Sequence, residues 1–216
     1  MRAASFSLLI ILCLLLAVAP AMADTLYNNG TFNGNTDAWQ IDYGFAVSDS
    51  FTVPHGSIIE DFHLAYWTAA GNQMTSVDMA FGSTSFGGTY NTYGVSGSTL
   101  LGTNNFGFAV YQSDLTSGLS VPWSGAGYVS LQNACTAGGC SAGEPQIFWD
   151  ENDGPSMAYA NSVGSIGSEA FTLTSCLCCG APGPDCGPPV PEPSSIMLFA
   201  SGILGVVGVL RRKLDR

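Results

Sequence analysis

Basic side chains are almost missing from this sequence. Its 216 residues contain 5 Lys and Arg against 16 Asp and Glu, which gives a formal net charge of −11 at pH 7. The basic residues lie only near the two ends, at Arg2, Arg211, Arg212, Lys213 and Arg216. The long body between them has nothing that neutralises phosphates. This excludes nucleic acid as a partner, and it excludes a phosphoryl-transfer site lined by Lys or Arg.

Helical periodicity is missing as well, and the good helix formers Glu, Lys and Arg are scarce. Gly, Ser, Thr and Asn dominate instead, and they separate short segments that alternate between apolar and polar residues. We expect strands within residues 45–53, 58–67, 77–81, 106–111, 127–132, 146–149 and 170–174. Roughly seven to ten such strands predict an all-β fold, an antiparallel β-sandwich or jelly-roll-like domain over residues 24–174.

The N-terminus has the plan of a secretory signal peptide. Arg2 precedes an apolar run from Phe6 to Val18, and the small-x-small triplet Ala21-Met22-Ala23 follows. We therefore expect residues 1–23 to be a signal peptide that is cleaved after Ala23 and exports the chain.

The C-terminus has three parts in order. A Pro-rich spacer ends at Pro191-Glu192-Pro193, and the uncharged run Ser194 to Leu210 follows it. The basic cluster Arg211, Arg212 and Lys213 closes the chain and would stay on the cytoplasmic side of a membrane. The uncharged run would rise about 25 Å as a helix, which is marginal for a ~30 Å hydrocarbon core. A permanent anchor and a sorting signal that is later processed both fit this plan.

Residues 191–216 resemble the PEP-CTERM sorting segment of Gram-negative exported proteins, with the motif, the Gly-rich apolar helix and the basic end in the same order. The resemblance implies that an exosortase-type enzyme in the inner membrane recognises Pro191, Glu192 and Pro193. It also implies that the chain is held in that membrane only transiently before release to the cell surface or an exopolysaccharide matrix. The body, from about Leu26 to Leu173, resembles a family of exported PEP-CTERM proteins through segments such as Val47–Thr52 and Ser83–Thr89. That family supplies no site residues.

Six cysteines remain after removal of the signal peptide: Cys135, Cys140, Cys176, Cys178, Cys179 and Cys186. An even number in an exported chain favours disulfides, and Cys135 with Cys140 would close a small Gly-rich loop. The last four lie in a Cys- and Pro-rich linker over residues 175–190. Zinc held by thiolates is the alternative for that cluster.

The densest acidic stretch follows an expected strand. Oxygen ligands at Asp150, Asn152 and Asp153 suit Ca²⁺, although no bidentate Glu completes an EF-hand pattern. A solvated acidic turn is the alternative interpretation. No other cofactor is expected.

Aromatic residues give the last functional indication. Trp39, beside Asp37 and Gln40, and Trp149, beside Asp150, are candidates for exposed rings that stack on a sugar. Core packing is the alternative role of such rings in a β domain.

Two function classes remain open on the sequence. The favoured one is a non-enzymatic exported protein of the surface or extracellular matrix, with extracellular polysaccharide as a possible partner. The alternative is a secreted hydrolase that acts on polysaccharide through paired carboxylates. Ser141 lies in a Gly-x-Ser-x-Gly pattern, but both histidines, His55 and His63, precede it, unlike the order of a nucleophile elbow.

Overall fold

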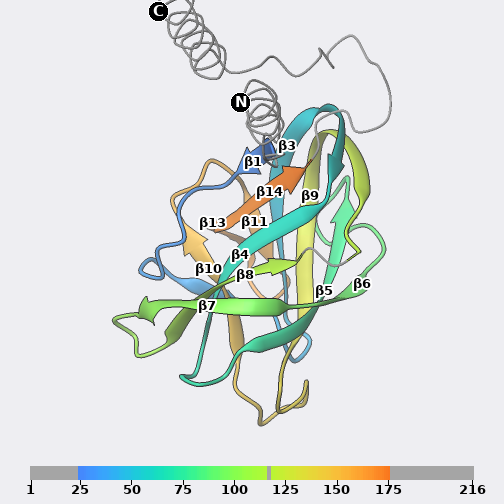
Figure 1. The fold of residues 1–216 in the computed structure, drawn as a ribbon. Helices are drawn as coiled ribbons and strands as arrows, with labels where there is room; N and C mark the ends of the chain where they lie inside the picture. Colours follow the sequence, from blue (N-terminus) through green and yellow to red (C-terminus); the bar gives the residue numbers. More distant parts are fainter. Residues whose placement is uncertain (1–23, 116–117, 176–216) are drawn as a thin grey trace, which may run out of the picture. The chain divides into compact units, whose positions relative to one another are not determined.

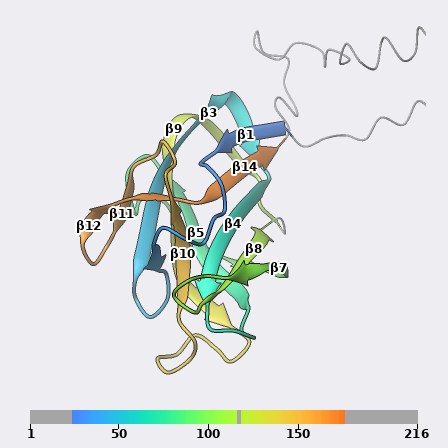
Figure 2. The same ribbon diagram turned by 90° about the vertical axis from the view of Figure 1, so that its left-hand side faces the viewer.

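Two antiparallel sheets make up the part of the chain that the computed structural model describes, residues 24–115 and 118–175. The predicted signal peptide, the four linker cysteines from Cys176 onward and the predicted sorting segment lie outside the described residues. Figures 1 and 2 show the two sheets as the layers of a sandwich. The predicted all-β antiparallel fold is thus confirmed. The described residues contain no helix long and apolar enough to span a membrane.

The two sheets differ in size. The first contains β1 (Asp24–Asn28), β2 (Ala38–Gln40), β4 (Asp61–Thr68), β7 (Ser96–Thr103), β8 (Ala109–Leu115), β10 (Ile147–Asn152), β13 (Ser168–Glu169) and β14 (Phe171–Ser175). The second contains β3 (Ala46–Ile59), β5 (Met74–Gly82), β6 (Asn91–Gly94), β9 (Val121–Thr136), β11 (Ala158–Ala160) and β12 (Gly164–Ile166). Every paired strand is antiparallel to its neighbour.

The strand pairing brings distant parts of the chain together. The first described strand, β1, pairs with the last, β14, so that Asp24 lies opposite Ser175. The two longest strands, β3 and β9, pair along their lengths in the other sheet. β4 lies between β8, β10 and β14 in the first sheet, which gives it a fixed position from which to present side chains.

Alternation along β4 determines which side chains enter the core. Phe62, Leu64 and Tyr66 are fully buried between the sheets, as the period of two in a strand predicts. The intervening residues His63 and Trp67 point to the opposite, outer face. The expected alternation in this segment is confirmed.

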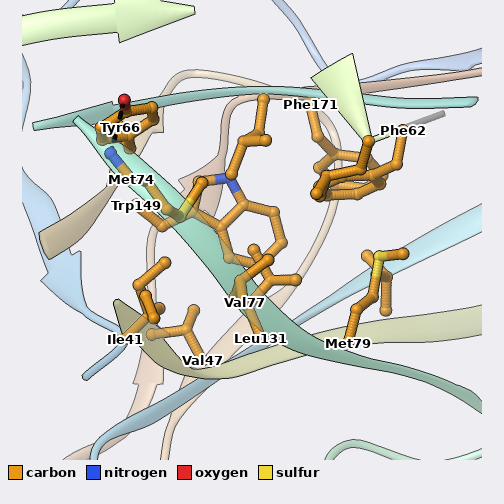
Figure 3. Close-up of a cluster of buried hydrophobic side chains, with 14 of the residues drawn as sticks. Ile41, Val47, Phe62, Tyr66, Met74, Val77, Met79, Leu131, Trp149 and Phe171 are labelled. Atoms are coloured by element: carbon orange, nitrogen blue, oxygen red, sulfur yellow. Dashed lines mark hydrogen bonds between the residues drawn. The ribbon is translucent and has the colours of Figure 1, made fainter. Parts of the chain in front are cut away.

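Trp149 lies in the centre of the core, as Figure 3 shows. Its ring meets Phe62 at 5.9 Å and Phe171 at 5.7 Å between centroids, and its Nε1 donates to the Ala170 carbonyl at 3.1 Å. The ring is 0% exposed. The prediction of an exposed sugar-contacting ring at Trp149 is therefore wrong. Trp149 lies opposite Tyr66 in the strand register, so its side chain projects from the inner face of the sheet. The neighbouring polar residue Asp150 does not change this orientation.

Two predicted strands have different boundaries in the structure. Residues 58–67 do not form one strand, because Glu60 separates β3 from β4 and its N–H donates to the Thr174 carbonyl at 3.1 Å. In the segment 106–111, Phe106 and Phe108 belong to the turn before β8. Strand boundaries depend on pairing partners that a local pattern does not contain.

The predicted pair Cys135 and Cys140 is joined by a disulfide, with 4.4 Å between the Cα atoms. It closes the turn that follows β9. Ser141 lies directly beyond this bridge, in a loop rather than at a strand-to-helix turn.

Replacing Trp149 by Ala should lower the free energy of unfolding by about 3–5 kcal/mol, because a large buried ring leaves a cavity between two sheets that cannot close over it. Urea unfolding of the purified protein measures this change. The matched control is Val163→Ala at a side chain that is 61% exposed, for which we expect a change within about 0.5 kcal/mol. Equal effects of the two substitutions would contradict the central position of Trp149.

Candidate functional site

The outer face of the first sheet carries aromatic side chains next to one another. Trp67 on β4 lies opposite Phe148 on β10 and opposite Val110 on β8. Directly opposed residues in an antiparallel pair project from the same face of the sheet. Trp67 is only 4% exposed although it points away from the core, so other groups cover it.

The turn between β7 and β8 provides part of that cover. The Phe106 ring stacks on the Trp67 ring at 5.6 Å between centroids, and the Phe108 ring lies 6.2 Å from it. Asn104 holds this turn, because its Oδ1 accepts the N–H groups of Phe106 at 3.0 Å and Phe108 at 2.9 Å. Gly107, with φ of 89°, supplies the left-handed conformation that the turn needs.

These rings surround a pocket of about 180 Å³. It is lined by Asp37, Ala38, Trp67, Phe106, Phe108 and Phe148. Phe108 meets Phe148 edge to face at 5.5 Å. Phe106 is 62% exposed at the mouth of the pocket, and Asp37 is the exposed ionisable side chain there. The pocket therefore combines an aromatic lining with a single carboxylate.

Asp150 positions both the floor and the rim of this pocket. Its Oδ1 accepts the indole N–H of Trp67 at 2.6 Å. Its Oδ2 accepts the backbone N–H groups of Asn33 at 3.1 Å and Gly34 at 3.2 Å, in the loop that leads to Asp37. A Cβ at Gly34 would come within 2.6 Å of Val110, so only glycine lets the loop lie this close to the sheet.

A second group of polar side chains lies inside the sandwich, around Asp49 on β3. The Asp49 Oδ2 accepts the Asn29 side-chain amide at 2.9 Å, the Ser156 hydroxyl at 2.8 Å and the Glu169 N–H at 2.7 Å. The Asn29 amide also donates to the Ser168 hydroxyl at 2.8 Å. Because Asp49 and Glu169 belong to different sheets, these bonds connect the two layers.

Burial changes the ionisation of this group. Loss of solvent raises the pKa of Asp49 to about 6, more than its hydrogen bonds lower it. Burial, together with the negative charge of Asp49, raises the pKa of Glu169 well above its usual range. Neither carboxyl oxygen of Glu169 has a hydrogen-bond partner among the described residues. Burial thus favours the neutral form of Glu169 in the sandwich.

The residues predicted to bind calcium have other partners. Asp150 is engaged as described above. Asn152 donates from Nδ2 to the Asn29 carbonyl at 2.6 Å, and its Oδ1 accepts the Gly154 N–H at 2.8 Å. Asp153 is exposed. No group of three or more His, Cys, Asp or Glu within residues 24–115 and 118–175 is placed to hold a metal ion. The structure gives Asp150 and Asn152 structural roles, and calcium binding stays a prediction.

Trp39, the other predicted sugar contact, is half-buried and packs against the edge of the core. Its indole N–H donates to the Glu151 carboxylate at 2.7 Å. Trp39 and Asp37, two residues apart, do not share the pocket, because only Asp37 lines it. The predicted sorting motif Pro191, Glu192 and Pro193, the basic cluster and the linker cysteines lie outside the described residues.

Sequence reasoning missed the pocket residues Trp67, Phe106 and Phe148. The alternation of β4 places Trp67 on the outer face, but the stacking partner, Phe106, lies 39 positions away in a segment predicted as strand. The Asn104–Gly107 turn is the one local signal that could have found it, since Asn and Gly favour such turns.

Comparison with known proteins identifies the C-terminal segment. Residues 189–213 match the family model of the PEP-CTERM protein-sorting motif. The predicted resemblance of the tail is confirmed, and the chain carries a PEP-CTERM protein-sorting motif at its C-terminal end. The motif supports export and processing by an exosortase-type enzyme at a membrane-associated sorting step. No curated protein and no solved structure matches the chain.

Glu169→Gln should change how stability depends on pH. Because folding raises the pKa of Glu169, its contribution is fully present below its unfolded value near 4.5 and is lost as pH rises through the folded value. Asp49 adds a similar loss between its ordinary 3.8 and about 6. The slope is about 1.4 kcal/mol per pH unit for each proton.

Urea unfolding at pH 5, 6, 7 and 8 measures this effect. We expect the parent to lose stability across the range, and Glu169→Gln to lose less above pH 6. Glu60→Gln, at an exposed position, is the matched control and should follow the parent. Identical pH profiles for the parent and Glu169→Gln would show that Glu169 is not a buried neutral acid.

Proposed function

We propose that this protein is a non-enzymatic component of the cell surface or extracellular matrix that binds extracellular polysaccharide. In this proposal a signal peptide exports the chain, the inner membrane holds it transiently, and an exosortase-type enzyme processes it at Pro191-Glu192-Pro193. The observation that carries the proposal is the match of residues 189–213 to the PEP-CTERM protein-sorting motif. The Cys135–Cys140 disulfide supports a location in an oxidising compartment, where such bonds persist.

The burial and the hydrogen bonds of the acidic side chains in the core support a role without catalysis. A retaining or inverting glycosidase needs two carboxyl groups that flank a substrate. Asp49, Asp150 and Glu169 are 0% exposed, and the first two accept hydrogen bonds that hold the fold.

Polysaccharide as the partner is supported by the chemistry of the surface. The body has no Lys or Arg between Ala3 and Leu210, which disfavours phosphate-rich and nucleic-acid partners. The aromatic pocket on the outer face offers flat apolar rings beside a hydrogen-bond acceptor, and such a combination suits a sugar, which has an apolar C–H face and hydroxyl donors.

Glu192→Ala tests the processing step. A simple anchor needs only an apolar span and the basic cluster, whereas a processed signal needs a recognisable extended segment, which the two prolines keep out of helix. We expect the parent in the extracellular fraction to lack Ser194–Arg216, and the variant to remain in the membrane with its tail intact. Intact-mass measurement decides between these outcomes.

Asp215→Ala, which removes the other acid of the tail, is the matched control and should be processed as the parent is. If the parent outside the cell still carries Ser194–Arg216, processing at the motif is excluded.

The alternative, a polysaccharide hydrolase, makes a different prediction. Incubation of the purified chain with extracellular polysaccharide should release no reducing ends if the protein only binds. A steady release that scales with protein concentration would favour the hydrolase over the matrix protein.

A further inference from the structure

We propose that the pocket between the β7–β8 turn and the outer face of β4 and β10 binds a single neutral or amino sugar ring. The inference rests on the polysaccharide partner proposed above and adds the site and the class of sugar. In this assignment the C–H face of the sugar packs on the aromatic lining, and Asp37 accepts hydrogen bonds from its hydroxyl or ammonium group.

One ring of the aromatic lining, Phe106, is exposed and already held in place before any ligand arrives. Phe106 is 62% exposed, so most of its ring is accessible to a ligand. Stacking on Trp67 and the two hydrogen bonds to the Asn104 side chain hold it in place. A ring that is already ordered loses little conformational entropy on binding.

The hydrogen-bond acceptor at the rim has free capacity. Among the described residues, the Asp37 carboxylate accepts one hydrogen bond, from the backbone N–H of Ala38 to Oδ1 at 2.8 Å. Its Oδ2 is thus available to a donor on a ligand, and the residue is exposed. The other lining side chains carry no free hydrogen-bond donor, because the Trp67 N–H is taken by Asp150.

Charge restricts the class of sugar. A carboxylate at the rim, on a body without Lys or Arg from Ala3 to Leu210, repels uronic acids and sulfated sugars. Uncharged sugars avoid this cost, and an amino sugar gains an attraction to Asp37. The pocket is therefore selective against the acidic units that many extracellular polysaccharides contain.

Size restricts the ligand further. The volume of about 180 Å³ is below the ~300–1,000 Å³ typical of sites for drug-sized molecules. One pyranose ring is the appropriate size, so the pocket should recognise a chain end or a branch residue.

An organic cation is the main competitor, since aromatic rings beside a carboxylate also recognise quaternary ammonium groups. Trp is the strongest ring for that interaction, but the Trp67 ring is 4% exposed beneath Phe106. A cation would therefore meet chiefly Phe rings, which attract cations less strongly than Trp does.

The test is saturation-transfer NMR on the full chain, purified in a detergent without a sugar headgroup. The probes are the methyl pyranosides of glucose, galactose and mannose, then glucosamine, glucuronate and tetramethylammonium. We expect transfer to the ring C–H protons of at least one neutral pyranoside and of glucosamine, and none to glucuronate.

Phe106→Ala should weaken this binding by about tenfold or more, which is about 1.4 kcal/mol. Phe106→Leu keeps an apolar side chain without a ring and should also weaken it. The matched control is Phe45→Ala, at another exposed ring outside the pocket (38% exposed), which should bind as the parent does. Unchanged melting temperatures will show that the variants are folded.

Asp37→Asn should weaken the binding of glucosamine and admit glucuronate. The inference is overturned if no pyranoside binds, if Phe106→Ala binds as the parent does, or if tetramethylammonium binds and the sugars do not. Binding of purified extracellular polysaccharide separates the two proposals. If the parent and Phe106→Ala retain it equally, the polysaccharide partner stands and the pocket is not its site.

Discussion

Every buried carboxylate in the described part of this protein is stabilised without a Lys or Arg, because the body contains neither. Charge neutralisation is replaced by neutral donors: amide N–H groups, hydroxyls and indole nitrogens. Asp49, in the second sheet, accepts hydrogen bonds from Glu169 of the first sheet and from the Asn29 side chain, and Asp150 accepts them from a neighbouring strand and a loop. Hydrogen bonds to a charged group are worth about 1.5–3 kcal/mol each, so these two carboxylates organise the chain around them. Within the described part of the chain, Glu169 has no hydrogen-bond donor at either carboxyl oxygen, and burial raises its pKa, which favours its protonated form.

Through these hydrogen bonds, the acidic residues also determine the positions of the aromatic residues of the outer face. Asp150 is buried and does not line the pocket, yet it orients the Trp67 indole and holds the loop before Asp37. The residues that line the pocket are thus positioned by a buried carboxylate that does not line it. Asp150, part of the densest acidic stretch of the sequence, is therefore a positioning residue that acts through the groups it binds.

The sequence predicts features that depend on residues close together in the chain better than features that depend on contacts between distant residues. Alternation in β4 and the close spacing of Cys135 and Cys140 are local, and both predictions are confirmed. The exposure of Trp149 depends on which face of its strand lies against the other sheet. The prediction from its position beside Asp150 placed it on the outer face, whereas it lies on the inner face. The pocket depends on contacts between β4, β10 and a turn far along the chain, which no single segment specifies.

The pairing of β1 with β14 bears on how such a chain crosses a membrane. The outermost strand of the first sheet finds its partner only in the last five described residues, Phe171–Ser175. The sheet therefore cannot close until nearly the whole domain has been delivered, and contacts over so long a separation form slowly. A chain that emerges from its N-terminus therefore gains the full cooperativity of the first sheet only after β14 has emerged.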